Sequence, residues 1–139
     1  MVYRAEIVAG GPAEHAIAYI AFLSTVGNIA AESNRRRYAL HLTSQYVVRL
    51  HDPRYQWSYN LFDVGGTEEL ERALGVLQTS EAYRLSQRTN GGNGVFQATF
   101  GKYRAFWAYL EAGHGIDERA IAAARPQWAI VCRRLERMG

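Results

Sequence analysis

The chain has 139 residues, a formal net charge of +3 and a hydrophobic content of 48%. This length predicts one domain over residues 1–139 with a single core, and the apolar content is typical of a folded protein and not of a disordered one. No apolar run approaches 18 residues, so we expect a cytoplasmic protein without a membrane segment.

The first segments predict an extended start followed by a buried helix. Residues 1–9 alternate weakly between apolar and polar, which is typical of an extended arm or a short edge strand. The Gly-Gly-Pro of residues 10–12 then predicts a helix start. The run AIAYIAFL is apolar on nearly every side, so we expect this helix to be buried and to end near Gly27-Asn28.

The next helix is expected to begin at a Ser33 or Asn34 cap and to continue to about residue 51, before Asp52-Pro53. Its predicted apolar arc comprises Ala39, Leu40, Leu42, Tyr46, Val47 and Leu50. The opposite arc comprises Arg37, His41, Ser44, Gln45, Val48 and Arg49, with Arg35 and Arg36 adding charge in the first turn. A surface helix usually carries both signs of charge, so a basic face without a carboxylate indicates a polyanion ligand. A solvated face that is basic by chance is the alternative.

The middle of the chain combines aromatic residues with a short acidic helix. Tyr55, Trp57, Tyr59 and Phe62 lie in a predicted loop and either tuck under the domain or stack on bases. Thr67 is expected to cap a helix with Glu68, Glu69 and Glu71 in its first turn and with Leu70, Leu74 and Leu77 buried. A further helix is expected over residues 80–88, with Arg84 and Arg88 on one row.

A central aromatic helix is predicted over residues 95–110. One arc comprises Val95, Phe96, Thr99, Phe100, Tyr103, Phe106, Trp107 and Leu110, and aromatic rings in this number predict the centre of the core. Small residues form the opposite stripe, namely Ala98, Gly101, Ala105 and Ala108, flanked by Lys102 and Arg104. Two interpretations stay open for the stripe: close packing of a second helix, or an interaction face for a partner or a nucleic-acid backbone. The turn before this helix, Asn-Gly-Gly-Asn-Gly at residues 90–94, is either a flexible connection with Asn93 as the cap or an anion site.

The chain is expected to end in a short helix from Asp117 and a last helix after Pro126. In the last helix Trp128, Val131, Cys132 and Leu135 are predicted to face inward, with Arg133, Arg134 and Arg137 outward. The whole pattern predicts an all-α fold, a single compact domain of five to seven helices around the helix at residues 95–110.

The sequence contains few signs of specific chemistry. The four histidines are scattered and the single cysteine has no partner for a disulfide, so we expect no metal site, no cofactor and no catalytic residue. One pairing is suggestive of an enzyme: Arg37 and His41 lie one turn apart, which resembles the Arg-to-His spacing of the helical HEPN ribonucleases. The residue beside that arginine is here another Arg or a Tyr, which departs from the usual pattern of the family.

Two stretches resemble known helical modules. Tyr19-Ile-Ala-Phe-Leu, followed by the helix start Asn-Arg-Arg-Arg-Tyr, resembles the core-binding (SAM-like) domain of tyrosine recombinases. The stretch from Tyr59 to Phe106 is similar to a helical module found beside nuclease domains in bacterial restriction-type defence proteins. The resemblance implies an accessory or DNA-contacting domain, with DNA-facing candidates Arg35, Arg36, Arg37, His41, Lys102 and Arg104.

The functional expectation is therefore non-catalytic DNA binding, mainly through phosphate contacts, in a bacterial mobile-element or defence setting. Duplex DNA is the favoured ligand, and the candidate binding residues are Arg35, Arg36, Arg37, His41, Gln45, Arg84, Arg88, Lys102 and Arg104. A protein-interaction module, acting as an inhibitor or adaptor through the small-residue face, is the second hypothesis, and a HEPN-like ribonuclease is the third. The sequence leaves the oligomeric state open.

Overall fold

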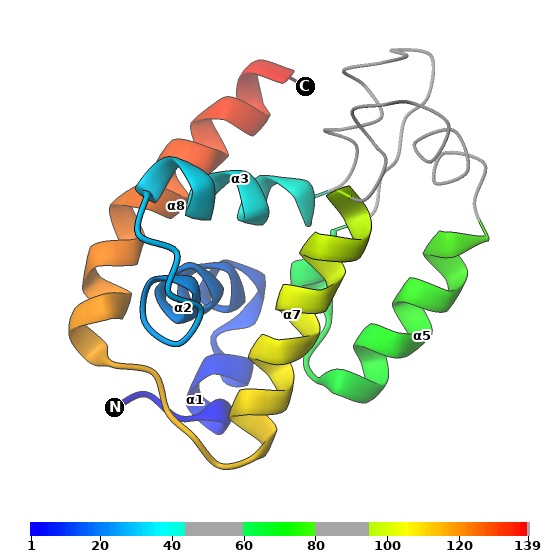
Figure 1. Cartoon of the computed structure of the whole chain (residues 1–139), viewed down its shortest axis with the longest axis horizontal. Helices are drawn as coiled ribbons and strands as arrows, with labels where there is room; N and C mark the ends of the chain where they lie inside the picture. Colours follow the sequence, from blue (N-terminus) through cyan, green and yellow to red (C-terminus); the bar gives the residue numbers. More distant parts are fainter. Residues whose placement is uncertain (44–59, 80–94, 139) are drawn as a thin grey trace.

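The computed structural model of the chain describes residues 1–43, 60–79 and 95–138, and these ranges are mainly helical. The elements in chain order are α1 Arg4–Ala9, α2 Gly11–Ser24, α3 Glu32–His41, the 3-10 helix η1 Leu61–Asp63, α5 Thr67–Gln78, α7 Val95–Glu111 and α8 Glu118–Met138 (Figure 1). The described ranges contain no strand, and their β-type pairings are two isolated bridges, Val2 with Ile116 and Thr43 with Asn60. The predicted all-α class is confirmed.

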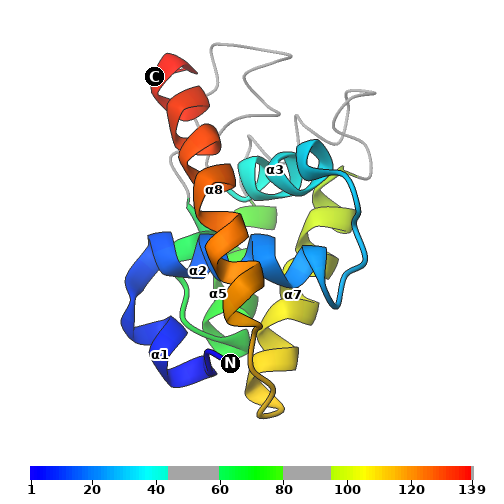
Figure 2. The same ribbon diagram turned by 90° about the vertical axis from the view of Figure 1, so that its left-hand side faces the viewer.

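Helix α2 runs through the middle of the described structure, with α1, α3, α7 and α8 around it (Figure 1 and Figure 2). Its residues from His15 to Leu23 are all buried, as expected of a helix that is apolar on nearly every side. Pro12 lies in the first turn, where the helix needs no backbone N–H donor from this position. Gly11 has a φ of +82°, a backbone conformation that favours glycine. The predicted buried helix is confirmed, although it ends at Ser24, slightly before the predicted end.

Helix α7 covers one side of α2 with aromatic rings. Its buried face comprises Thr99, Phe100, Tyr103, Phe106, Trp107 and Leu110. The ring of Tyr103 lies edge-on to Tyr19 of α2, at 5.1 Å between centroids, and edge-on to Phe62 of η1, at 5.5 Å. Each such pair contributes about 0.5–1.5 kcal/mol beyond the area that it buries. The predicted aromatic core helix is confirmed, and Phe62 belongs to the same core.

The small-residue stripe of α7 faces outward. Ala98, Gly101, Ala105 and Ala108 are all exposed, and a Cβ atom added at Gly101 would meet no atom within 4 Å. The interpretation that a second helix packs closely against this stripe is therefore wrong for the part of the chain that the structure describes. Periodicity locates such a stripe correctly but does not say whether another element covers it.

The start of the chain is a helix and not an extended arm. Helix α1 buries Ile7, at 3% exposure, and its neighbour Val8 packs against the core at intermediate burial. The expected strand pairing is confined to one residue. The N–H of Val2 donates to the carbonyl oxygen of Ile116 at 2.9 Å, and the N–H of Ile116 donates back at 2.8 Å. A weak alternation of apolar residues over this short segment thus corresponds to one bridge followed by a short helix of six residues.

Helix α3 begins earlier and ends earlier than predicted. The residue at its N-cap is Ala31, which makes no side-chain cap, and the helix ends at His41. Because the helix starts at Glu32, a carboxylate lies in the first turn and the arginines follow it, an arrangement that the helix dipole favours. The buried positions Ala39 and Leu40 agree with the predicted apolar arc. The rest of the predicted helix, residues 44–51, lies outside the described residues.

Helix α5 has its predicted buried stripe of Leu70, Leu74 and Leu77. Thr67 is its first residue and not its cap. The N–H of Thr67 is instead capped by a carboxylate from the end of α7, since Glu111 Oε1 accepts its hydrogen bond at 2.9 Å.

Helix α8 is one continuous helix, whereas two helices separated at Pro126 were predicted. Pro126 removes the N–H that would bond the carbonyl of Ala122. The next carbonyl gains a donor, because Gln127 Nε2 donates to the carbonyl oxygen of Ala123 at 3.2 Å. Packing of α8 along α2 and α3 (Figure 2) keeps the helix intact across the proline.

Several predicted features lie outside the described residues. They are the helix at residues 80–88, the glycine-rich turn at residues 90–94, and the aromatic residues Tyr55, Trp57 and Tyr59.

Candidate nucleic-acid interface

Arg35 was predicted to bind a ligand, but it is buried and is not available to one. Only 8% of this residue is exposed. Its Nη1 donates to the carbonyl oxygens of Ile29, at 2.6 Å, and Ala30, at 3.1 Å. Its Nε donates to Oε1 of Gln127 in α8 at 3.4 Å. All these acceptors are neutral, and Arg35 makes no ion pair with any described residue. Arg35 therefore joins α3 to α8 and does not contribute to an exposed basic face.

Arg104 is also committed to a partner. Its Nε and Nη2 donate to the two carboxylate oxygens of Glu71, the latter bond being 3.1 Å long, and this fork joins α7 to α5. The hydrogen bonds from Arg104 lower the pKa of the Glu71 carboxyl, and those same bonds raise the pKa of the guanidinium. The predicted role of Arg104 in phosphate binding conflicts with this pairing, because a ligand would have to compete with a bidentate carboxylate.

Arg36, Arg37 and Lys102 lie at or near α3. Arg36 Nη1 is 3.7 Å from Oε2 of Glu32, a loose pair one helical turn apart. Arg37 is exposed and makes no hydrogen bond or ion pair with a described residue. The Nζ of Lys102 lies 5.2 Å from the centroid of the Tyr38 ring, which brings this lysine from α7 to the side of α3. Arg37 is thus the predicted residue that is best placed for a ligand.

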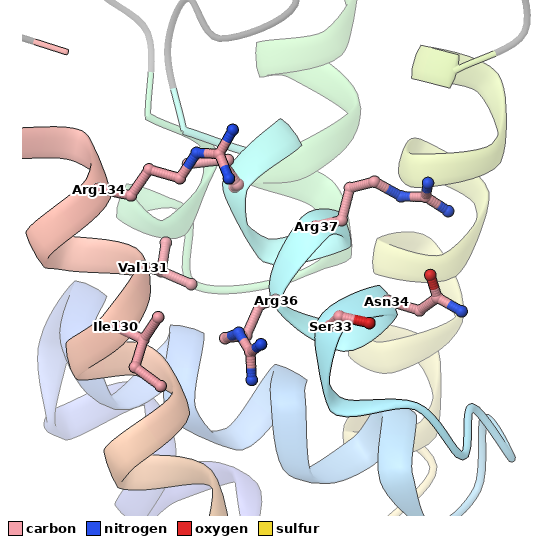
Figure 3. Close-up of a pocket in the computed structure, with 8 residues that line it drawn as sticks. Ser33, Asn34, Arg36, Arg37, Ile130, Val131 and Arg134 are labelled. Carbon is pink, nitrogen blue, oxygen red and sulfur yellow. The ribbon is translucent and has the colours of Figure 1, made fainter. Parts of the chain in front are cut away.

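A hollow of about 340 Å³ separates α3 from α8, and arginines from both helices line it (Figure 3). Its lining comprises Ser33, Asn34, Arg36, Arg37 and Leu40 of α3 with Ile130, Val131 and Arg134 of α8. A second hollow lies along the outer side of α8 and is lined by Ile130, Arg133, Arg134 and Arg137. We call the two hollows together the arginine cleft, which presents five arginines.

The arginine cleft has a consistent charge. Among the described residues, none of those that line it is acidic. Glu32 reaches Arg36 from the first turn of α3. The last turns of α8, which present Arg137, extend beyond α3 in both views (Figure 1 and Figure 2). The cleft can therefore approach an extended anionic surface without steric obstruction from α3.

Sequence reasoning placed Arg133, Arg134 and Arg137 on the outer side of the last helix but did not include them among the ligand-binding candidates. Together with Ile130 they recur at intervals of three and four residues, so they share one face of α8. That spacing was a usable signal. Their proximity to Arg36 could not be read from the sequence. The residues lie about a hundred positions apart and come together only through the packing of α3 on α8.

His41 is largely uncharged at neutral pH. Burial, and to a smaller extent the nearby charge of Arg37, lower its pKa to about 4. A neutral imidazole adds no positive charge to the face predicted from the sequence. A neutral imidazole can accept a proton but cannot act as a proton donor near pH 7. The ribonuclease interpretation of Arg37 and His41 stays a prediction, in which His41 could act only as a base.

Three further predicted binding residues, Gln45, Arg84 and Arg88, lie outside the described residues. Within the described ranges there is no group of three or more His, Cys, Asp or Glu side chains that could hold a metal ion. None of the described helices has the length and apolar character needed to cross a membrane.

Comparisons with models of protein families, with curated proteins and with solved structures find no match for this chain. The resemblance to recombinase and restriction-type modules accordingly stays a prediction from the sequence.

Proposed function

We propose that this protein binds nucleic acid without catalysing a reaction, with duplex DNA as the favoured ligand, and that the arginine cleft makes the phosphate contacts. The observation that carries the proposal is the gathering of five arginines from α3 and α8 along hollows whose described lining includes no carboxylate. The bacterial mobile-element or defence setting implied by the sequence resemblance belongs to the same proposal.

The chemistry of arginine supports a phosphate ligand. A guanidinium group presents several N–H donors in a planar fork that matches two phosphate oxygens, and it stays charged at any physiological pH. Arg37 and Arg137 are exposed, and in the described structure neither pairs with a carboxylate. Binding to a phosphate would therefore cost neither group an existing partner.

The revised binding residues are Arg36, Arg37, Arg133, Arg134 and Arg137, with Lys102 at the edge of α3. Arg35 and Arg104 are removed from the set because each has protein partners. His41 is removed because it is neutral near pH 7.

Charge variants with a matched control test this proposal. Arg37→Gln and Arg137→Gln each remove one exposed cation from the arginine cleft. Arg119→Gln removes an exposed cation from the opposite end of α8, outside the cleft. Fluorescence anisotropy with a random-sequence duplex should show each cleft variant binding about fivefold more weakly at low salt, while the control binds like the original protein. Absence of binding at low salt, or an equal loss in the control, would contradict the proposal.

A second candidate function is protein interaction through the small-residue face of α7. The specific observation is that Ala98, Gly101, Ala105 and Ala108 are exposed and that no described helix covers them. Gly101→Glu would place a charge in this face, where a Cβ atom meets open space. A partner recovered from the native host with the original protein, but not with this variant, would support the second candidate, provided that DNA binding is unchanged.

A further inference from the structure

The floor of the hollow between α3 and α8 is apolar, which phosphate contacts alone do not require. Leu40 and Val131 are buried at 4% and 2% exposure, and Ile130 beside them is 40% exposed. An isoleucine at the mouth of a cationic hollow leaves apolar surface in contact with water. Such surface gains free energy when a flat apolar group displaces that water.

Polar groups surround this floor. Arg36 and Arg134 extend from opposite helices toward the hollow (Figure 3). Ser33 and Asn34 are among the residues that line it, and the side chain of neither makes a hydrogen bond with another described residue. A hydroxyl and an amide supply both donors and acceptors, which suits the edge of a nucleobase. Guanidinium planes can also stack on an exposed base.

The size of the hollow selects a small ligand. Its volume of about 340 Å³ lies near the lower end of the range of roughly 300–1,000 Å³ for small-molecule sites. One base with its sugar is a unit of this scale, whereas the paired and stacked bases of a duplex cannot enter a hollow between two helices.

We propose that the hollow between α3 and α8 holds one unpaired nucleotide of a nucleic-acid strand, with its base against Ile130 and Val131. This inference rests on the proposed function, since the flanking phosphates would bind the surrounding arginines. The occupant belongs to a strand and is not a free nucleotide, because Arg133 and Arg137 continue along α8 beyond the hollow and would meet the neighbouring phosphates. A duplex with an unpaired base, a frayed end or a flipped-out base offers such a unit.

Three oligonucleotides test the inference with the full chain: a short duplex, the same duplex with one unpaired base in the middle of a strand, and the latter with an abasic residue in place of that base. The unpaired base should increase affinity about tenfold, as expected from stacking of one base, and the abasic residue should remove the gain. Equal affinity for all three would overturn the inference and leave the proposed function standing. If the protein binds none of the three oligonucleotides, both the inference and the proposed function are overturned.

A variant of the floor gives an independent test. Ile130→Ser should abolish the preference for the unpaired base, so that this variant binds the plain duplex and the unpaired-base duplex with equal affinity. Val76→Ser is the matched control, since Val76 is 67% exposed on α5, outside the cleft. Preference that survives Ile130→Ser would overturn the inference. Displacement of the unpaired-base duplex by a nucleoside monophosphate at equal concentration would also overturn the inference. Polyglutamate that binds as tightly as this duplex would overturn it too.

Discussion

The Nε of Arg35 donates a hydrogen bond to Oε1 of Gln127 at 3.4 Å, and this contact joins the two helices that form the arginine cleft. The same arginine holds the chain before α3 through the carbonyls of Ile29 and Ala30. Gln127 in turn donates to the backbone of α8. A buried cation thus fixes the distance between two groups of exposed cations.

Replacing Arg35 should destabilise the protein. Arg35→Ala leaves two carbonyl oxygens and the Gln127 amide without their donor, so we expect a loss of about 2–4 kcal/mol in the free energy of unfolding. Arg37→Ala, at the exposed position two residues later, should change it by less than about 0.5 kcal/mol. Urea denaturation of both variants measures the difference. Equal, small effects would mean that Arg35 does not join the helices as described.

Replacing Pro126 should stabilise α8. Pro126→Ala restores the N–H that bonds the carbonyl of Ala122 within a continuous helix, and a proline in a helix interior costs about 3 kcal/mol relative to alanine. Because Pro126 is exposed, we expect a gain of about 1–3 kcal/mol in thermal or urea unfolding. Ala129→Pro, one turn later, should be strongly destabilising. A destabilised Pro126→Ala variant would instead indicate a helix that ends at the proline.

His41 should give the protein a stability that depends on pH. Its pKa in the folded state, about 4, lies below the ordinary value of 6.5, because burial and Arg37 disfavour the charged ring. The unfolded chain therefore binds a proton first, and stability falls as the pH decreases from about 6.5 to 4. The full loss is on the order of 3 kcal/mol. His41→Gln should remove this slope, which urea denaturation at several pH values would reveal. An imidazole that titrates near 6.5 in an NMR experiment on the folded protein would contradict the prediction.

The ion pair of Glu71 with Arg104 should contribute little to the stability of the fold, and it should do so only above acidic pH. The pKa of Glu71 is lowered in the folded state, so the stabilisation is present above the ordinary carboxyl pKa and is lost as the pH falls through the lowered value. Both side chains are substantially exposed, at 49% and 42%, so Glu71→Gln should cost less than about 1 kcal/mol at neutral pH. The cost should shrink in high salt and disappear in acid. A loss of stability that persists at acidic pH would point to packing in place of charge.

Hydrophobic periodicity predicted the fold class and the buried faces of α2, α5 and α7, because the spacing of apolar residues is a local property. It could not predict that Pro126 is tolerated, since the tertiary packing of α8 decides that. Nor could it distinguish the buried Arg35 from its exposed neighbour Arg37. Burial of Arg35 depends on carbonyls before α3 and on an amide 92 residues away, which come together only in the folded protein.

For the candidate site, the residue pattern predicted the helix that carries Arg36 and Arg37 but not which side chains lie around them. Lys102 does reach the side of α3, whereas Arg104 turns to Glu71 on α5. The arginines of α8 complete the cleft from the far end of the chain. A list of basic residues does not reveal which of them have carboxylate partners, and that pairing decides which remain available to a ligand.

Salt dependence is the most direct test of whether the arginine cleft binds a nucleic-acid backbone. The logarithm of the association constant for a random-sequence duplex should fall linearly with the logarithm of the salt concentration, with a slope of about −0.9 for each phosphate contacted. Replacing Arg36, Arg37, Arg134 and Arg137 together by glutamine should make that slope shallower by about 0.9 for each lost contact, whereas Arg119→Gln should leave it unchanged. A slope near zero for the original protein, or the same steep slope in the fourfold variant, would contradict the account.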